Sequence, residues 1–101
     1  MLERDVEKYL VKRVAEAGGL CWKWAGRVGV PDRVVMLPDG NVIFVEVKTK
    51  GGKLSKMQII THRKMMDIGC DVKVVWNKKD VDLLLDDFLD KKIVKLGETD
   101  E

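Results

Sequence analysis

Two short segments of the sequence carry side chains that could perform chemistry together, Pro31-Asp32 and Glu46-Val47-Lys48. Side chains alternate along a strand, so Glu46 and Lys48 point to one side of a strand and Val47 points to the other. Asp32 lies at the entrance of the preceding strand, from which its carboxylate can converge on Glu46. Two carboxylates that meet beside a backbone carbonyl form an oxygen-rich site suited to Mg²⁺ or Mn²⁺.

Such a site has the parts needed for phosphodiester hydrolysis. A divalent cation polarises a phosphoryl oxygen and lowers the pKa of a bound water, while Lys48 could hold that water or neutralise charge that develops on the phosphate. The same residues are also compatible with an ordinary pair of Glu46 and Lys48 at a strand end, with Asp32 capping a turn. Neither interpretation is excluded by these two segments alone.

A basic segment follows this pair. Residues 47–66 contain no acidic residue, and their basic residues are Lys48, Lys50, Lys53, Lys56, Arg63 and Lys64. The segment predicts salt-dependent attraction of a polyanion, or alternatively only a solvated helix face. Gln58 and His62 are four residues apart and share a helix face. Gln58 could reach the strand end and orient a water or a phosphate, whereas a lone histidine is more often a surface or packing residue.

Hydrophobic periodicity and turn residues divide the chain into helix, three strands, helix, strand and helix, which predicts an α/β fold. The first helix starts at Leu2 and stops at Gly18-Gly19, and the second runs from an N-cap at Ser55 to Gly69. Asp80 is expected to cap the last helix. The expected strands are 20–24, 33–37, 41–48 and 71–76, with Pro38-Asp39-Gly40 as a hairpin turn.

The composition indicates one small domain, with a core at about residues 1–90 and a polar, acidic tail at 91–101. Hydrophobic residues make up 46% and charged residues 36% of the 101 positions, which argues against disorder, and no apolar run is long enough to span a bilayer. We therefore expect a cytoplasmic protein without a membrane partner. Cys21 and Cys70 are expected to be buried thiols rather than a disulfide.

Four blocks, read in order, resemble one known family. They are Glu3, GVPD at 29–32, EVK at 46–48 and GGKLSKMQ at 51–58. The set resembles the VRR-NUC family (virus-type replication-repair nuclease) of the PD-(D/E)xK superfamily, and the likeness extends from about Glu3 to Phe88. Asp-through-ExK alone is a weak signal, whereas the ordered set followed by the stop at Gly69 is specific. The resemblance implies a restriction-endonuclease-like αβββαβ core, with a central mixed sheet flanked by helices.

The resemblance also implies roles for single residues. Asp32 and Glu46 would be metal ligands assisted by the Val47 carbonyl, with Lys48 as the catalytic lysine and Gln58 as the helix glutamine. Glu3 corresponds to the acidic residue of the first helix, with Glu7 one turn later as its rival. The positions expected to contact DNA are Lys50, Lys53, Lys56, His62 and Arg63.

The activity implied is that of a Mg²⁺- or Mn²⁺-dependent DNA endonuclease that favours Holliday junctions or other branched DNA. Small stand-alone members of the family, typically from phages, resemble junction-resolving enzymes that act as homodimers, which would place this chain in the cytoplasm of a bacterial host. One alternative is a non-catalytic nucleic-acid-binding module that uses the same basic face, and another is a structural or interaction protein. Trp22 and Trp24 could stack on bases, but packing against a helix or a dimer partner is the more common use of such residues.

Overall fold

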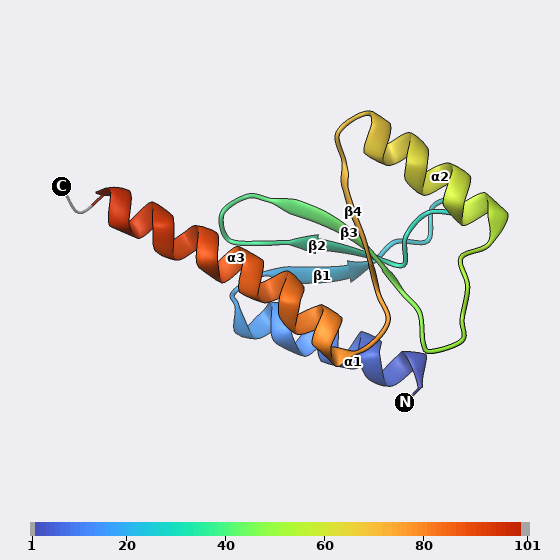
Figure 1. Ribbon diagram of the computed structural model, residues 1–101, viewed down its shortest axis with the longest axis horizontal. Coiled ribbons are helices and arrows are strands. Elements are labelled where there is room, and N and C mark those ends of the chain that lie inside the picture. Colours follow the sequence, from blue (N-terminus) through green and yellow to red (C-terminus); the bar gives the residue numbers. More distant parts are fainter. Residues whose placement is uncertain (1, 100–101) are drawn as a thin grey trace.

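The computed structural model describes the backbone of residues 2–99 and the side chains of residues 2–90. Helices and strands within that range alternate in the order that the sequence predicts (Figure 1). The elements are α1 (Glu3–Glu16), β1 (Leu20–Lys23), β2 (Arg33–Met36), β3 (Val42–Val47), α2 (Lys56–Asp67), β4 (Asp71–Val75) and α3 (Lys78–Thr99).

The strands form one mixed sheet with the order β1-β2-β3-β4. β1, β2 and β3 pair in antiparallel fashion, and β3 pairs with β4 in parallel. The predicted hairpin between β2 and β3 is confirmed: Gly40 has a φ of +85°, and the Asn41 N–H donates to Asp39 Oδ1 at 2.9 Å. β3 therefore has a neighbour on each side, and its carboxyl end carries Glu46 and Val47.

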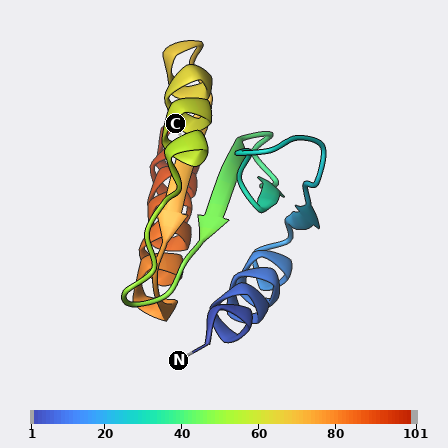
Figure 2. The same ribbon diagram turned by 90° about the vertical axis from the view of Figure 1, so that its right-hand side faces the viewer.

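The helices lie on both faces of this sheet. α1 and α3 run side by side against one face (Figure 1), where apolar side chains from both helices and the strands form the core. These side chains include Val6, Leu10, Val14, Val35, Val45, Val47, Val81, Leu85 and Phe88. Glu46 alternates with Val45 and Val47, so it points to the opposite face, on which α2 lies. Figure 2 shows residues 48–55 leaving the tip of β3 as an open loop before the chain returns to α2.

The start and the extent of α3 differ from the sequence prediction. Asp80 is not the N-cap: the helix begins at Lys78, and Asn77 Oδ1 accepts a hydrogen bond from the Asp80 N–H at 2.8 Å. Asp80 Oδ2 instead accepts from the Trp76 N–H at 2.8 Å, so its carboxylate closes the first turn from inside the helix. The helix then continues to Thr99, through most of the expected polar tail. Residues 100 and 101 lie outside the described residues.

Cys21 and Cys70 are free thiols, as predicted, although both are half-buried rather than buried. Trp24 packs against Phe44 with ring centroids 5.1 Å apart, whereas Trp22 is 60% exposed. Over residues 2–99, no helix combines the length and the apolar character that crossing a membrane requires.

Candidate active site

The pairing register of β2 and β3 brings the two predicted carboxylates together. Arg33 pairs with Val45, so the next residues along the two antiparallel strands, Asp32 and Glu46, are cross-strand neighbours, for which about 5 Å between Cβ atoms is usual. Asp32 is fixed through both its side chain and its main chain. Its Oδ2 accepts from the Val47 N–H at 2.9 Å, and its carbonyl accepts from the Trp24 N–H at 2.9 Å.

The Glu46 carboxylate is buried among polar neighbours. Its side chain lies on the α2 side of the sheet, and the residue is 1% exposed. Its Oε2 accepts from Gln58 Nε2 at 3.0 Å and lies 3.5 Å from Lys48 Nζ. Its Oε1 is buried without a hydrogen-bond partner. A buried carboxylate oxygen without a partner costs free energy, which makes this atom a candidate ligand for a cation.

The environment of Glu46 favours its neutral form. The pKa of this carboxyl is raised from 4.5 to about 7, first because the group is buried and second because Asp32 is negatively charged, while the ammonium of Lys48 acts in the opposite direction. Two carboxylates that share a site resist double ionisation, and a divalent cation between them removes that repulsion. The raised pKa of Glu46 is therefore consistent with a site that favours a positive charge.

Gln58 reaches Glu46 because the first turn of α2 holds its side chain. Ser55 Oγ accepts from the Gln58 N–H at 3.1 Å, and Gln58 Oε1 accepts from the Ser55 N–H at 2.9 Å. This reciprocal capping box confirms Ser55 as the N-cap. Because the amide oxygen faces Ser55, the amide nitrogen is left to donate to Glu46.

Gly29 allows the loop that precedes Asp32 to lie directly on α2. It has a φ of +90°, and a Cβ atom there would lie 2.6 Å from Thr61 Oγ1 and 2.9 Å from the Met57 carbonyl oxygen. No side chain larger than hydrogen fits in this space. Gly29 belongs to the GVPD block, in which it has no predicted role, and a glycine three residues before Asp32 was the available signal for this close approach.

The remaining predicted residues are divided between the surface and the interior. Lys50, Lys53, Lys56 and Arg63 are exposed, on the open loop and the helix beside the site. His62 differs from this expectation, because it is 3% exposed and so does not lie on the exposed basic face. The packing of α2 on the sheet explains this burial. His62 lies on the same helix face as Gln58, and that face is turned toward the sheet.

The two acidic residues of α1 have different surroundings. Glu7 Oε2 lies 2.8 Å from Arg33 Nε and accepts its hydrogen bond. Glu3 is exposed and is the first residue of α1, and in both ribbon views the start of this helix lies at the end of the molecule where the 48–55 loop turns (Figures 1 and 2). The Glu7 carboxylate is thus already paired with the Arg33 guanidinium, whereas Glu3 is exposed to solvent.

The donor set of the site fits a hard divalent cation. Mg²⁺ is commonly bound through one or two carboxylates and completes its shell with waters and substrate phosphates. Asp32 and Glu46 supply two carboxylates, one of which has the buried, unpartnered oxygen. Among the side chains of residues 2–90, no cluster of three or more His, Cys, Asp or Glu could hold a metal, so these residues leave part of the cation's shell to water and substrate.

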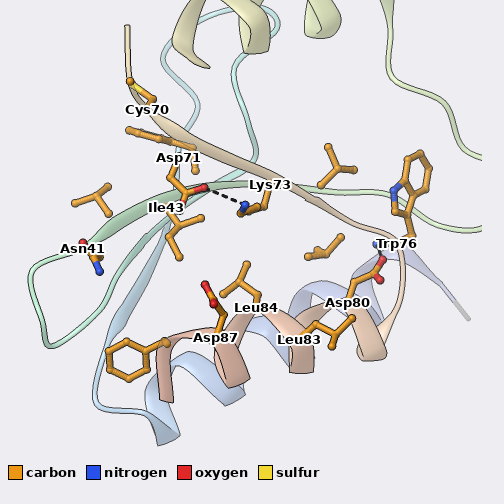
Figure 3. Close-up of a pocket in the computed structure, with 16 residues that line it drawn as sticks. Asn41, Ile43, Cys70, Asp71, Lys73, Trp76, Asp80, Leu83, Leu84 and Asp87 are labelled. Atoms are coloured by element: carbon orange, nitrogen blue, oxygen red, sulfur yellow. Dashed lines mark hydrogen bonds and ion pairs between the residues drawn. The ribbon is translucent and has the colours of Figure 1, made fainter. Parts of the chain in front are cut away.

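A hollow lies elsewhere, between α3 and the β3–β4 pair (Figure 3). This groove has a volume of about 930 Å³, and the residues that line it include Asn41, Cys70, Asp71, Lys73, Trp76, Asp80 and Leu83. None of the predicted site residues lines it. The groove is therefore separate from the carboxylate pair, and its size is not a reason to place the chemistry there.

Comparisons with known proteins agree with this fold. The family model described as "VRR-NUC domain" matches residues 3–78. A relative named "Putative nuclease p44", from Acyrthosiphon pisum secondary endosymbiont phage 1, is 40% identical over 85 residues, which cover 82% of this chain and 90% of that protein. A solved structure titled "VRR_NUC domain" superposes with a TM-score of 0.75 at 38% identity, covering 83% of this chain and 94% of the other.

Proposed function

The chain belongs to the VRR-NUC domain family, a family of nucleases, and from this premise we propose that it is a metal-dependent endonuclease that hydrolyses phosphodiester bonds in DNA. One observation carries the proposal: a buried carboxylate oxygen of Glu46 has no partner, although a second carboxylate and an ammonium lie beside it. Such an arrangement is costly for a folded chain unless a cation and a phosphate complete it.

Mg²⁺ or Mn²⁺ would be held by Asp32, Glu46 and the Val47 carbonyl, and when bound it would polarise the scissile phosphate and activate a water molecule. Lys48 holds the attacking water or a phosphate oxygen through its ammonium group. Gln58 keeps the Glu46 carboxylate oriented by donating to Oε2. Glu3, whose carboxylate is exposed, is the acidic residue of α1 that we place at this site in preference to Glu7, which pairs with Arg33.

The DNA backbone would lie along the exposed basic residues next to this centre. Lys50 and Lys53 belong to the open loop, and Lys56 and Arg63 belong to α2. Contacts of this kind bind phosphate without reading sequence, which suits an enzyme that recognises the shape of its substrate.

Branched DNA and a homodimer form part of the same proposal. The sheet face opposite α1 and α3 exposes large apolar side chains, namely Leu20 at 50%, Trp22 at 60% and Val42 at 43%. Exposed apolar patches mark interaction surfaces, and a second copy of the chain would cover this one and present two active sites to a junction. The phage source of the p44 relative favours the cytoplasm of a bacterial host as the place of action.

The test is a cleavage assay with labelled four-way junctions and with linear duplexes of the same arm sequences. With Mn²⁺, wild-type protein should cut the junctions, and Asp32→Ala and Lys48→Ala should lower the rate by at least about 100-fold. EDTA should abolish cleavage. Equal rates for wild type and both variants would refute the enzymatic proposal, and equal cleavage of junctions and duplexes would refute only the preference for branched DNA.

A non-catalytic DNA-binding module is the second candidate, favoured by the number of exposed basic side chains against only two converging carboxylates. It predicts DNA binding that weakens with salt, does not respond to Mn²⁺ and survives Glu46→Gln. Calorimetry with Mn²⁺ in the absence of DNA separates the two functions, because only the nuclease requires the carboxylate pair to bind the cation.

A further inference from the structure

Two buried side-chain atoms among the described residues have no hydrogen-bond partner, Glu46 Oε1 and His62 Nε2. An unpartnered buried polar atom costs about 1–3 kcal/mol, so folded proteins contain few of them. Glu46 belongs to β3 and His62 to α2, the helix whose Gln58, one turn before His62, hydrogen-bonds Glu46. A single bound species between them would satisfy both.

The position of His62 supports this reading. It lies one turn after Gln58, which contacts Glu46 directly, and it is the buried residue of α2. The charges of Asp32 and Lys48 act both on its imidazole and on the Glu46 carboxyl. Ile59 and Ile60 of the same helix are 48% and 41% exposed. Apolar residues are usually the buried ones, so a helix that buries its histidine and exposes its isoleucines indicates that a polar side chain is needed at the buried position.

The neutral form of the His62 imidazole fits a hydrogen bond to an uncharged molecule such as water. Burial lowers the pKa of His62 below its ordinary value, and Lys48 lowers it further, while Asp32 opposes both effects. A neutral imidazole offers one N–H donor and one acceptor nitrogen, which suits a water molecule. In this arrangement His62 holds the water and does not coordinate the cation itself.

We propose that His62 is a positioning residue of this site, whose Nε2 shares one bound water molecule with Glu46 Oε1 and thereby orients the Glu46 carboxylate toward a divalent cation. The inference rests on the proposed function, since it assigns the cation to Asp32 and Glu46. Replacing a residue that hydrogen-bonds a metal-binding side chain, without touching the metal itself, typically changes the affinity for the metal by 10- to 100-fold. His62 thus acts on the reaction through Glu46 and not on the DNA.

The first experiment measures Mn²⁺ affinity by calorimetry without DNA. His62→Phe keeps the ring volume and removes both nitrogens, and it should raise the dissociation constant at least about 10-fold. His62→Gln, which returns a polar group near the position of Nε2, should recover part of the loss. Met66→Ala, one turn further along α2 at a 49% exposed residue, is the control and should bind Mn²⁺ as wild type does. Wild-type affinity in His62→Phe would overturn the inference.

The second experiment needs no substitution, because the chain contains a single histidine. Long-range ¹H–¹⁵N spectra therefore report on His62 alone. Adding Mg²⁺, which is diamagnetic, should shift the Nε2 resonance along a curve that saturates with the dissociation constant found by calorimetry. An Nε2 resonance that stays in place while Mg²⁺ binds would overturn the inference even if His62→Phe failed to fold.

These readouts distinguish the two proposals. If wild type binds Mn²⁺ and His62→Phe weakens that binding, but no DNA is cut, the positioning role holds and the nuclease proposal fails. If DNA is cut while both His62 variants bind Mn²⁺ as wild type does, the reverse is true. A structural role alone would lower the melting temperature of His62→Phe without changing its affinity for Mn²⁺.

Discussion

The strand-end site and the groove beside α3 both combine carboxylates with a lysine, and they differ in what those charges contact. In the groove, Lys73 Nζ lies 3.4 Å from Asp71 Oδ1, and both side chains are about half exposed at 56% and 47%. At the strand end, Lys48 and Glu46 are only 18% and 2% exposed, and one oxygen of Glu46 lacks a partner. Water screens the first pair, whereas the second is held in a medium where charge is costly.

The difference teaches that a large hollow and a reactive site need not coincide. The groove of about 930 Å³ is lined by apolar side chains and by charges that water can satisfy. The strand end has a buried carboxylate with one unpartnered oxygen, beside a second carboxylate and an ammonium. Perturbed, partly unsatisfied groups are the better guide to chemistry, because folding does not place them without compensation.

The sharpest test of this contrast replaces the lysine of each region. Lys48→Met should lower DNA cleavage by at least about 100-fold, because it removes the ammonium that stabilises charge at the phosphate. Lys73→Met removes the same charge from the groove and should leave cleavage within about twofold of wild type. Rates on the same junction under saturating Mn²⁺ decide the matter. A comparable loss in both variants would show that the groove takes part in the reaction.

Gly29 tests whether the site depends on close packing between the loop and α2. Gly29→Ala should lower cleavage by roughly 10- to 100-fold, because the added Cβ pushes Met57 and Thr61 away and moves Gln58 with them. Gly40→Ala is the matched control. Gly40 also has a positive φ, but nothing lies within 4 Å of an added Cβ.

Both alanine variants should lose roughly 1–2 kcal/mol of stability from the left-handed backbone. Only Gly29→Ala should lose activity below its melting temperature. Equal activity losses in the two variants would attribute the effect to general destabilisation rather than to the contact with α2.

The carboxylate pair makes the stability of the metal-free protein depend on pH. The pKa of Glu46 is raised in the fold to about 7 from 4.5, so its favourable contribution is full below about pH 4.5 and is lost as the pH rises through 7. Glu46→Gln, which resembles the protonated form, should raise the melting temperature by several degrees at pH 8 and by much less at pH 5.

Thermal unfolding in EDTA measures this difference, and Asp71→Asn in the groove is the control that should show no such dependence on pH. Adding Mn²⁺ should stabilise wild type and not Glu46→Gln. A melting temperature that changes with pH in the same way for wild type and Glu46→Gln would contradict the coupling between burial and the cation site.

The smallest effect is expected at the exposed basic residues. Lys50→Gln and Lys53→Gln should each weaken DNA binding a few-fold and reduce the slope of log affinity against log salt by about 1, with little effect on the cleavage rate at saturating DNA. Lys79→Gln, at an exposed residue of α3, should change neither quantity. Fluorescence anisotropy at several salt concentrations measures both, and an unchanged slope would remove these lysines from the DNA path.

Much of the fold follows from local sequence signals. The periodicity of Val6, Leu10 and Val14 identifies the buried face of α1, and the turn at Pro38-Asp39-Gly40 sets the register that places Asp32 opposite Glu46. The spacing of Ser55 and Gln58 indicates the start of α2. These features are predictable because residues close in sequence determine them.

The missed features depend on contacts between distant segments. Asp80 looks like an N-cap because it precedes the apolar pattern, but Asn77 starts the helix and Asp80 bonds back to Trp76. The burial of His62 could not be predicted, since α2 leaves its isoleucines exposed and its orientation depends on the loop that Gly29 allows to approach. The roles of Asp32, Glu46, Lys48 and Gln58 remain predictions for the assays above.

The capping box of α2 couples the opening of the first helical turn to the position of the Glu46 carboxylate. One amide side chain closes the first turn at Ser55 and also holds the carboxylate, so unwinding that turn releases both at once. Amide hydrogen exchange at the start of α2 should slow when a cation engages Glu46, because each event immobilises the same side chain. The end of a helix thereby becomes a reporter of what happens at the end of the strand that precedes it.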